Sequence, residues 1–221
     1  MQVTMSEAAA SAPKAADGAF LRSRVGSLLA VFPLGIWTIN HLWNNLAAFK
    51  GAQAWQTAVT EYPHPLAHLV TMIVVLLPMV LHTIWGISRM AQTRPNIQKY
   101  TFWGNLKFIL QRLSAMGLVL FLGAHVWLAM LHPRFVDGHA EPFADISEQM
   151  RHHMPTLAVY VLGTLGVSYH LANGLHTFAM GWGLVVSRRA LRKFDVAVIG
   201  LFLVFLGMGW SAIYALWAAA S

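Results

Sequence analysis

The feature that most constrains this chain is a series of five apolar windows, each long enough to cross a lipid bilayer as a helix. About 20 helical residues span the hydrocarbon core, and the windows cover residues 25–49, 66–91, 106–131, 154–186 and 194–218. Charged residues make up 10% of the chain, whereas soluble domains carry roughly 25%. Because a helix satisfies its backbone hydrogen bonds within one segment, we predict an all-α polytopic membrane protein with a five-helix transmembrane bundle.

The windows belong to one predicted domain, residues 22–221, which follows a short polar tail. Residues 1–21 are rich in Ala and Ser and lack the apolar stretch of a signal peptide, so we expect a flexible tail. Pro33 and Pro78 fall inside the first and second windows and predict local kinks. The chain has no cysteine, which excludes disulfides and any iron–sulfur cluster held by its own thiolates.

The distribution of basic residues predicts how the bundle is oriented. Of the 15 Lys and Arg residues, only Lys50, Arg134 and Arg151 lie on the side that carries the C-terminus. The positive-inside rule therefore places the N-terminus in the cytoplasm and the C-terminus outside. The basic residues behind the net charge of +7 serve first to orient the helices in the membrane. They also make the cytoplasmic face positive, which suits anionic headgroups or a soluble partner. We expect no binding to nucleic acid.

Four of the windows each carry one histidine well inside the apolar stretch. With a rise of about 1.5 Å per residue, His41 and His125 lie about 24 and 28 Å from the cytoplasmic ends of their windows. His82 and His170, in windows that run the other way, lie about 24 Å from the outer ends. The sequence therefore predicts two depth-matched pairs, one near the outer surface and one near the cytoplasm.

Two imidazoles on facing helices can ligate haem iron at both axial positions, which leaves iron suited to electron transfer. A flat macrocycle needs small residues beside it, and such residues lie four positions from these histidines: Gly86, Gly166, Gly174 and Ala129. The alternatives are ordinary helix packing with interhelical hydrogen bonds, or a haem-free carrier that binds a metal through histidine. No Asp or Glu falls in the interior of a window, so the carboxylates of a typical proton or cation carrier are missing.

These histidine segments resemble the membrane-anchor cytochrome b subunit of succinate:quinone oxidoreductases (succinate dehydrogenase and fumarate reductase), in the single-chain dihaem form with five spans. The resemblance runs from about residue 24 to 189 and rests on GSLLAVFPLGIWTINHLWNN, LPMVLHTIWGI, FILQRLSAMGLVLFLGAHVW and YHLANGLHTFAMGWGLVVSRR. It implies that His41 and His125 ligate an outer haem b, and that His82 and His170 ligate an inner one.

The resemblance also implies partners and a reaction. A flavoprotein subunit and an iron–sulfur subunit would dock on the cytoplasmic face of the cell membrane, and the complex can form a higher oligomer. Succinate would be oxidised on the partner, so this chain supplies no catalytic residue for that step. Electrons would pass through the haems to a quinone, with menaquinone expected. A runner-up is the cytochrome b of another quinone-linked dehydrogenase, of the hydrogenase or formate dehydrogenase type.

Further site residues follow from the chemistry of the expected ligands. Haem propionates need cationic or hydrogen-bonding partners, and the inner candidates are Arg24, Ser27, Gln111, Arg112, Arg188 and Lys193. A quinone needs donors to two carbonyl oxygens. The outer candidates are Trp43, Asn44, Asn45 and Glu61, and the inner candidates are His176, Arg24 and Ser27. Glu61 lies in AWQTAVTEYP, which predicts a short amphipathic helix along the interface.

In the wider family, some members carry an acid on the fourth span just before the ligating histidine, where it serves transmembrane proton movement. Ser168 and Tyr169 occupy that place in this chain. A proton route of that type is therefore not expected.

Overall fold

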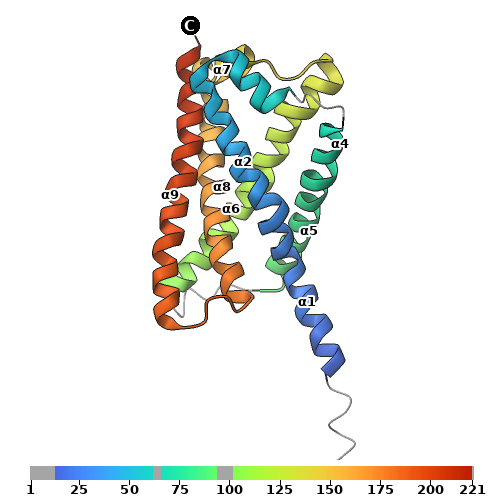
Figure 1. The fold of residues 1–221 in the computed structure, drawn as a ribbon, viewed down its shortest axis with the longest axis vertical. Coiled ribbons are helices and arrows are strands. Elements are labelled where there is room, and N and C mark those ends of the chain that lie inside the picture. Colours follow the sequence, from blue (N-terminus) through green and yellow to red (C-terminus); the bar gives the residue numbers. More distant parts are fainter. Residues whose placement is uncertain (1–12, 62–65, 94–101, 221) are drawn as a thin grey trace, which may run out of the picture.

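The computed structural model describes residues 13–61, 66–93 and 102–220, and every regular element within these ranges is helical. The long helices run side by side as rods along one axis (Figure 1). The upper end carries the C-terminus and the short helix α7 (Phe143–His152), and the lower end carries α1 (Pro13–Leu29) and the connection between the last two rods. Helix α1 begins inside the segment that the sequence predicted as a tail, because Pro13 suits a first helical turn. Residues 1–12 lie outside the described part.

Three rods contain π-helical turns as well as α-helix. The first consists of α1, a π turn (Ala30–Gly35), α2 (Ile36–Asn45) and a 3₁₀ turn (Leu46–Lys50). The second consists of α4 (Ala67–Thr71), a π turn (Met72–Leu76) and α5 (Leu77–Ala91). The third is α6 (Trp103–Val126), extended by π turns at Trp127–Leu131 and Pro133–Asp137. The last two rods are α8 (Met154–Gly181) and α9 (Arg188–Ala219).

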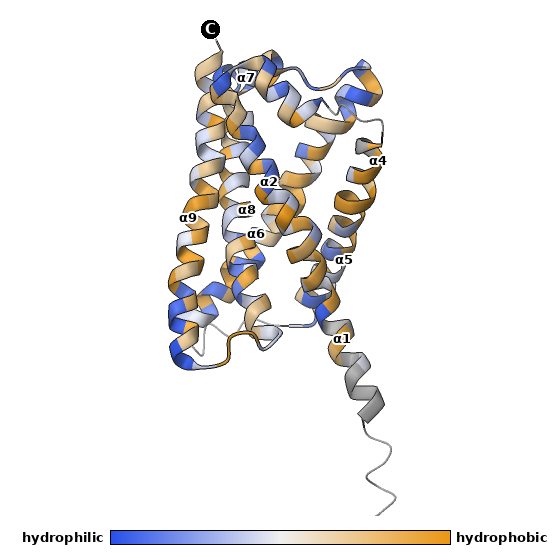
Figure 2. Cartoon of the chain, viewed as in Figure 1, coloured by the Kyte–Doolittle hydropathy of each residue, from blue (hydrophilic) through white to orange (hydrophobic). Residues whose placement is uncertain are grey.

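Four helices of the described part are long and apolar enough to cross a membrane: Arg24–Lys50, Leu69–Ala91, Trp103–Asp137 and Arg188–Ala219. Figure 2 shows apolar residues along the middle of the rods and hydrophilic residues gathered at the two ends. By length and composition, these helices confirm four of the five predicted windows. The fourth window corresponds to α8, whose 28 residues are long enough but include polar side chains that lower its mean hydropathy.

The predicted end of the fourth window was wrong by five residues. Helix α8 ends at Gly181 and not at Val186. Gly183 has a φ of 71°, the left-handed conformation with which helices commonly terminate, and glycine adopts it without strain. An apolar run that continues past Gly183 conceals this stop when windows are read by hydropathy alone.

Both prolines that predicted kinks lie at π-helical turns. Pro33 lies inside the turn Ala30–Gly35, and Pro78 is the second residue of α5, which follows the turn Met72–Leu76. Proline lacks a backbone donor and crowds the preceding turn of an α-helix. A wider π turn relieves both problems, so the disturbance is absorbed within the rod and does not end it.

Helix α8 is the centre of the bundle, with α6 on one side and α9 on the other. Glycines allow both approaches, because a Cβ on Gly163 would collide with Phe121 of α6 and a Cβ on Gly209 would collide with Thr164 of α8. Close backbone approach through small residues is the usual packing mode of membrane helices. The side chains of α8 therefore reach the neighbours on both sides.

The upper end is closed by a small apolar core that involves two short helices. Trp55 ends α3 (Ala52–Trp55), and a π turn (Gln56–Thr60) continues it to Glu61, which matches the helix predicted for AWQTAVTEYP within the described residues. Helix α7 was not predicted. Its buried residues Phe143, Ile146 and Met150 recur at helical spacing and pack with Trp55 and the end of α9.

Candidate functional site

The four histidines from four different windows meet as two pairs, as their depths predict. The ring centroids of His41 on α2 and His125 on α6 are 6.0 Å apart. Those of His82 on α5 and His170 on α8 are 6.3 Å apart. Tyr160 contacts His125, and His170 follows ten residues later on α8, so the two pairs are separated by about 15 Å along that helix.

The spacing within each pair matches two imidazoles that share one metal ion. A ligating ring nitrogen lies about 2 Å from the metal, and the ring centre lies about 1 Å behind that nitrogen, so two opposed rings have centroids roughly 6 Å apart. Both pairs meet this distance, with ring planes at 65° and 75° to each other. Among the described residues, no group of three or more His, Asp or Glu side chains converges as a metal site.

Space for a flat group also exists beside the lower pair. Gly86 lies one turn beyond His82, and a Cβ added there would meet no atom within 4 Å. The other predicted small residues lie closer to their neighbours, since a Cβ on Gly166 would be 3.8 Å from Leu118 and one on Gly174 would be 3.7 Å from Gln111. The open side of the lower pair is therefore the side of α5.

Hydrogen bonds to Nδ1 fix the tautomer of His82. Its Nδ1 lies 2.9 Å from the carbonyl oxygen of Gly26. A carbonyl only accepts, so Nδ1 carries the proton and Nε2 keeps the lone pair that a metal needs. Gly26 is suited to this contact because a Cβ there would collide with Trp85 on α5, so only glycine lets the α1 backbone come this close.

His170 is oriented by α6. Its Nδ1 lies 3.3 Å from Oγ of Ser114 and 3.2 Å from Nε2 of Gln111. The Ser114 hydroxyl donates to the Gln111 carbonyl oxygen at 2.9 Å, which leaves its oxygen free to accept the proton of Nδ1. The Gln111 side chain is itself anchored, because it donates to the His170 carbonyl and accepts from Asn173 at 2.8 Å.

In the upper pair, aromatic rings and one hydroxyl hold the imidazoles. The Nδ1 of His125 lies 3.1 Å from the Tyr160 hydroxyl, and Phe121 stacks on the same ring at 5.5 Å. Trp37 stacks on His41 with ring centroids 4.6 Å apart. Trp37 and Phe121 lie one turn before these histidines on the same helices, α2 and α6, whereas Tyr160 reaches His125 from α8.

Asn45 links His41 to the upper core. Its side-chain nitrogen donates to the His41 carbonyl oxygen at 2.8 Å and lies 3.4 Å from Nε2 of His41. The indole of Trp55 donates to the Asn45 side-chain oxygen at 3.2 Å. Of the other outer quinone candidates, Trp43 is 67% exposed, Asn44 is partly buried, and exposed Glu61 accepts from the Thr57 hydroxyl at 3.4 Å.

Among the predicted propionate partners, Gln111 contacts His170, and Ser27 neighbours the Gly26 contact to His82. The Arg24 guanidinium lies beside Gly181, further toward the lower end. Ser27 follows Gly26 in the chain; its hydroxyl donates to the Arg24 carbonyl oxygen at 2.7 Å and accepts from Trp182 at 3.2 Å. The Nε of Arg24 is buried and has no hydrogen-bond partner. An orphaned guanidinium nitrogen at this place fits an anionic group that approaches from the lower pair.

The remaining cationic candidates lie elsewhere. Arg112 donates to the Thr93 carbonyl oxygen at 3.0 Å, contacts the Thr93 hydroxyl, and places its guanidinium over the Phe108 ring. It therefore caps the end of α5. Arg188 and Lys193 are exposed in the first turns of α9.

The sequence reasoning missed a partly buried charge cluster, formed by Lys107, His176 and Asp195. One carboxylate oxygen of Asp195, Oδ1, lies 2.8 Å from Nζ of Lys107 and 2.9 Å from Nε2 of His176. The acids that stand out in the sequence belong to the outer loops, whereas Asp195 lies at the lower end among cations. Asp195 is the single acid in the basic run RRALRKFD, and that isolation was the available signal.

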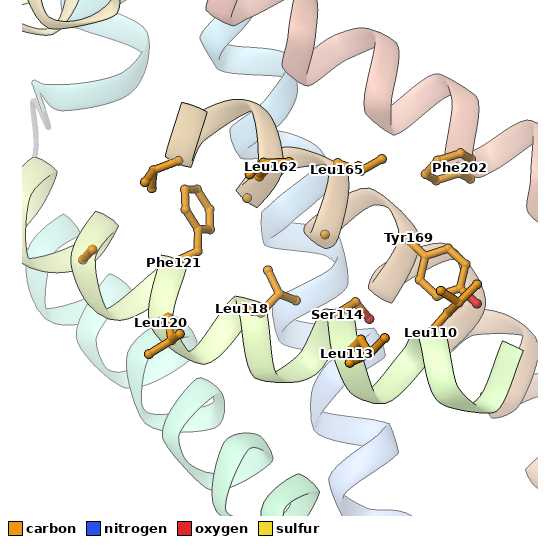
Figure 3. Close-up of a pocket in the computed structure, with 15 residues that line it drawn as sticks. Leu110, Leu113, Ser114, Leu118, Leu120, Phe121, Leu162, Leu165, Tyr169 and Phe202 are labelled. Atoms are coloured by element: carbon orange, nitrogen blue, oxygen red, sulfur yellow. The ribbon is translucent and has the colours of Figure 1, made fainter. Parts of the chain in front are cut away.

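An apolar groove of about 580 Å³ runs between α6 and α8 and reaches α9. Figure 3 shows Leu118, Phe121, Leu162, Tyr169 and Phe202 around it. Ser114 and Phe121 line this groove and also contact His170 and His125. At each of these two positions, a single side chain therefore separates the groove from a paired histidine.

Comparison with known proteins agrees with this arrangement. Residues 91–209 match the family described as the succinate dehydrogenase/fumarate reductase transmembrane subunit. The succinate dehydrogenase cytochrome b558 subunit of Bacillus subtilis (strain 168) is 29% identical over 197 residues, which cover 89% of this chain and 96% of the relative. No solved structure matches the chain. The resemblance in the histidine segments is confirmed: the chain belongs to the family of succinate dehydrogenase/fumarate reductase transmembrane subunits, as a multi-pass protein of the cell membrane.

Proposed function

We propose that this chain is the dihaem cytochrome b anchor of a succinate dehydrogenase complex and passes electrons from an iron–sulfur subunit to a quinone. The observation that carries the proposal is the pair of opposed imidazoles at each of two levels, with centroids 6.0 and 6.3 Å apart. Membership of the family favours this reading over a hydrogenase or formate dehydrogenase cytochrome. The arrangement of the histidines in two pairs favours a haem cytochrome over a carrier that binds a metal through histidine.

His41 and His125 ligate the upper, outer haem b, and His82 and His170 ligate the lower, inner one. A haem iron with two axial imidazoles exchanges one electron at a time and offers no open coordination site. The chain's part is to orient the four imidazoles. Gly26, Ser114 and Tyr160 contact Nδ1 of three of them, and Trp37 stacks on the fourth, His41. The orphaned Nε of Arg24 supports this residue as a propionate partner of the inner haem.

The bundle crosses the membrane five times, with α8 as the fourth span. Its 28 residues measure about 42 Å, enough to cross a bilayer. It packs between α6 and α9, which shield its polar residues from lipid. Because Arg188, Arg189, Arg192 and Lys193 lie at the lower end, that end faces the cytoplasm and the C-terminus lies outside.

The lower face receives the iron–sulfur subunit, which carries the flavoprotein subunit that oxidises succinate. The exposed basic side chains at the start of α9 offer complementary charge to an acidic partner surface. Electrons enter at the inner pair and reach menaquinone. For an outer quinone site, Asn45 is the first candidate, since it alone among the outer candidates contacts a ligating histidine. For an inner site, Arg24 and Ser27 are the first candidates.

Purification of the whole complex and a reduced-minus-oxidised spectrum test this proposal. We expect b-type haem at two per copy of this chain, together with co-purified flavoprotein and iron–sulfur subunits. A folded complex without visible absorbance from haem b would contradict it. If the haem-containing complex instead contained a hydrogenase or formate dehydrogenase partner, the cytochrome b assignment would stand and the succinate dehydrogenase assignment would be wrong.

A further inference from the structure

The charge cluster of Lys107, His176 and Asp195 joins three helices near the lower end, and the proposed electron path does not use it. Lys107 lies on α6, His176 on α8 and Asp195 on α9. Lys107 and His176 both approach the same oxygen, Oδ1 of Asp195, at 2.8 and 2.9 Å. The ring of Phe194 stacks on His176 with centroids 5.8 Å apart, which closes one face of the imidazole.

The three side chains of the cluster differ in their exposure to solvent. The side chain of Asp195 is 38% exposed, that of Lys107 20% and that of His176 6%. The Nε2 atom of His176 is buried and, despite its closeness to Asp195, has no aligned hydrogen-bond partner. A proton on Nε2 would turn this contact into a charge-assisted pair. The exposed carboxylate thus connects water to a buried nitrogen that can take up a proton.

Among the three side-chain types, histidine is the one whose unperturbed pKa lies nearest neutral pH. Lys107 supplies a fixed positive charge that balances the carboxylate. Arg24 of α1 packs against Gly181, more than one turn further along α8, and the remaining cations of α9 near the cluster, Arg192 and Lys193, are exposed. The cluster is therefore neutral with an unprotonated His176 and carries one positive charge when His176 is protonated.

The cluster lies close to the lower histidine pair. His176 follows His170 by six residues, a rise of about 9 Å along α8. Between them, Asn173 donates to Gln111, whose side chain borders Nδ1 of His170. A unit charge added at the lower pair acts on His176 across buried protein, where electrostatic interactions are stronger than in water.

We propose that the charge cluster is a proton-uptake site coupled to the lower histidine pair, an inference that rests on the proposed function. When one electron from the iron–sulfur subunit arrives at the inner haem, one proton from cytoplasmic water passes by Asp195 to Nε2 of His176. The added negative and positive charges balance. When the electron leaves for the quinone, the proton returns to cytoplasmic water by way of Asp195, so the cluster regains its starting charge after each electron.

Redox titration of the haem bands in the intact complex at pH 6, 7 and 8 tests this coupling. The inner component is the one that His82→Ala removes. In the wild type we expect its potential to fall as pH rises, toward the limit of about 59 mV per pH unit for one proton per electron. In His176→Gln and in Asp195→Asn the slope should flatten, while the slope of the outer component stays unchanged.

The exposed acid–histidine pair of α7, Glu148 and His152, whose side-chain atoms are 3.9 Å apart, supplies matched controls. Glu148→Gln and His152→Gln should leave both slopes as in the wild type. An unchanged inner slope in both cluster variants would overturn the inference, and so would loss of the inner haem from both, since the cluster would then be structural. Absence of haem from the wild type would instead overturn the proposed function.

Discussion

The imidazole of His82 is held by the backbone of another helix, with its Nδ1 2.9 Å from the carbonyl oxygen of Gly26. The contact joins the first and second rods beside the lower histidine pair. It also depends on a glycine, since any side chain at position 26 would collide with Trp85. Gly26 therefore determines both the packing of α1 against α5 and the tautomer of His82.

Replacing Gly26 by alanine should separate α1 from α5 and release His82. Overpacking of this kind costs about 1–3 kcal/mol, and we expect selective loss of the inner haem band together with a lower melting temperature. Gly207→Ala is the matched control, because a Cβ at Gly207 on α9 meets no atom within 4 Å. Retention of the inner haem in Gly26→Ala would show that the Gly26 contact is dispensable.

Tyr160→Phe should raise the potential of the outer haem while leaving the haem in place. Nδ1 of His125 lies 3.1 Å from the Tyr160 hydroxyl. With Nε2 bound to iron, Nδ1 carries the proton and donates it to this hydroxyl, and such a bond makes the imidazole a better donor to oxidised iron. A neutral hydrogen bond is worth about 1 kcal/mol, which corresponds to about 40 mV for one electron. Tyr169→Phe, whose hydroxyl donates to the Lys107 carbonyl oxygen, should leave the outer potential where it is in the wild type. Equal shifts in both variants would assign no special role to Tyr160.

Ser114→Ala should produce the corresponding change at the inner haem. The Ser114 oxygen lies 3.3 Å from Nδ1 of His170, so its removal weakens the donor strength of that ligand. We expect a higher inner potential in redox titration and an altered low-spin resonance in electron paramagnetic resonance. Ser168→Ala is the control, because the Ser168 hydroxyl donates to the Thr164 carbonyl oxygen of its own helix. A spectrum of Ser114→Ala identical to the wild type would contradict the assignment.

Glu141, which precedes α7 at the upper end, predicts a pH-dependent stability. Its burial, and then the charge of Asp145, hold the pKa of Glu141 above its ordinary value of 4.5. The folded protein therefore binds this proton more tightly than the unfolded chain does, so the contribution to stability is present at low pH and is lost as pH rises through the raised value. Glu141→Gln should raise the melting temperature at pH 7.5, and the gain should shrink toward pH 4.5.

Glu148→Gln is the control for that experiment, because this acid of α7 is exposed. It should leave the melting temperature unchanged at both pH values. A gain for Glu141→Gln of the same size at pH 4.5 and pH 7.5 would point to packing and would reject the electrostatic cause.

Much of the fold could be predicted because apolar length and basic charge are local properties of the sequence. The depths of His41, His82, His125 and His170 follow from helical rise alone, which is why their pairing could be predicted from their positions in the chain. The short helix α7 was missed because its ten residues carry too little apolar length to stand out, although Phe143, Ile146 and Met150 have helical spacing.

The contacts that orient the ligands could not be predicted, because they depend on how helices rotate against each other. Ser114 and Tyr160 are unremarkable on their own helices, and only the close approach of α6 and α8 brings each to an imidazole. The contact of Arg112 with Thr93 at the end of α5 could not be predicted for the same reason. Asp195 was missed because its partners come from two other helices.

The central claim is that His41 pairs with His125 and His82 pairs with His170, each around one haem iron. Reduced-minus-oxidised spectra of the four single histidine-to-alanine variants, recorded on the intact complex, test it most directly. The account predicts that the His41 and His125 variants lose one spectral component and keep the other, and that the His82 and His170 variants do the reverse. Loss of the same component from the His41 and His82 variants would contradict it.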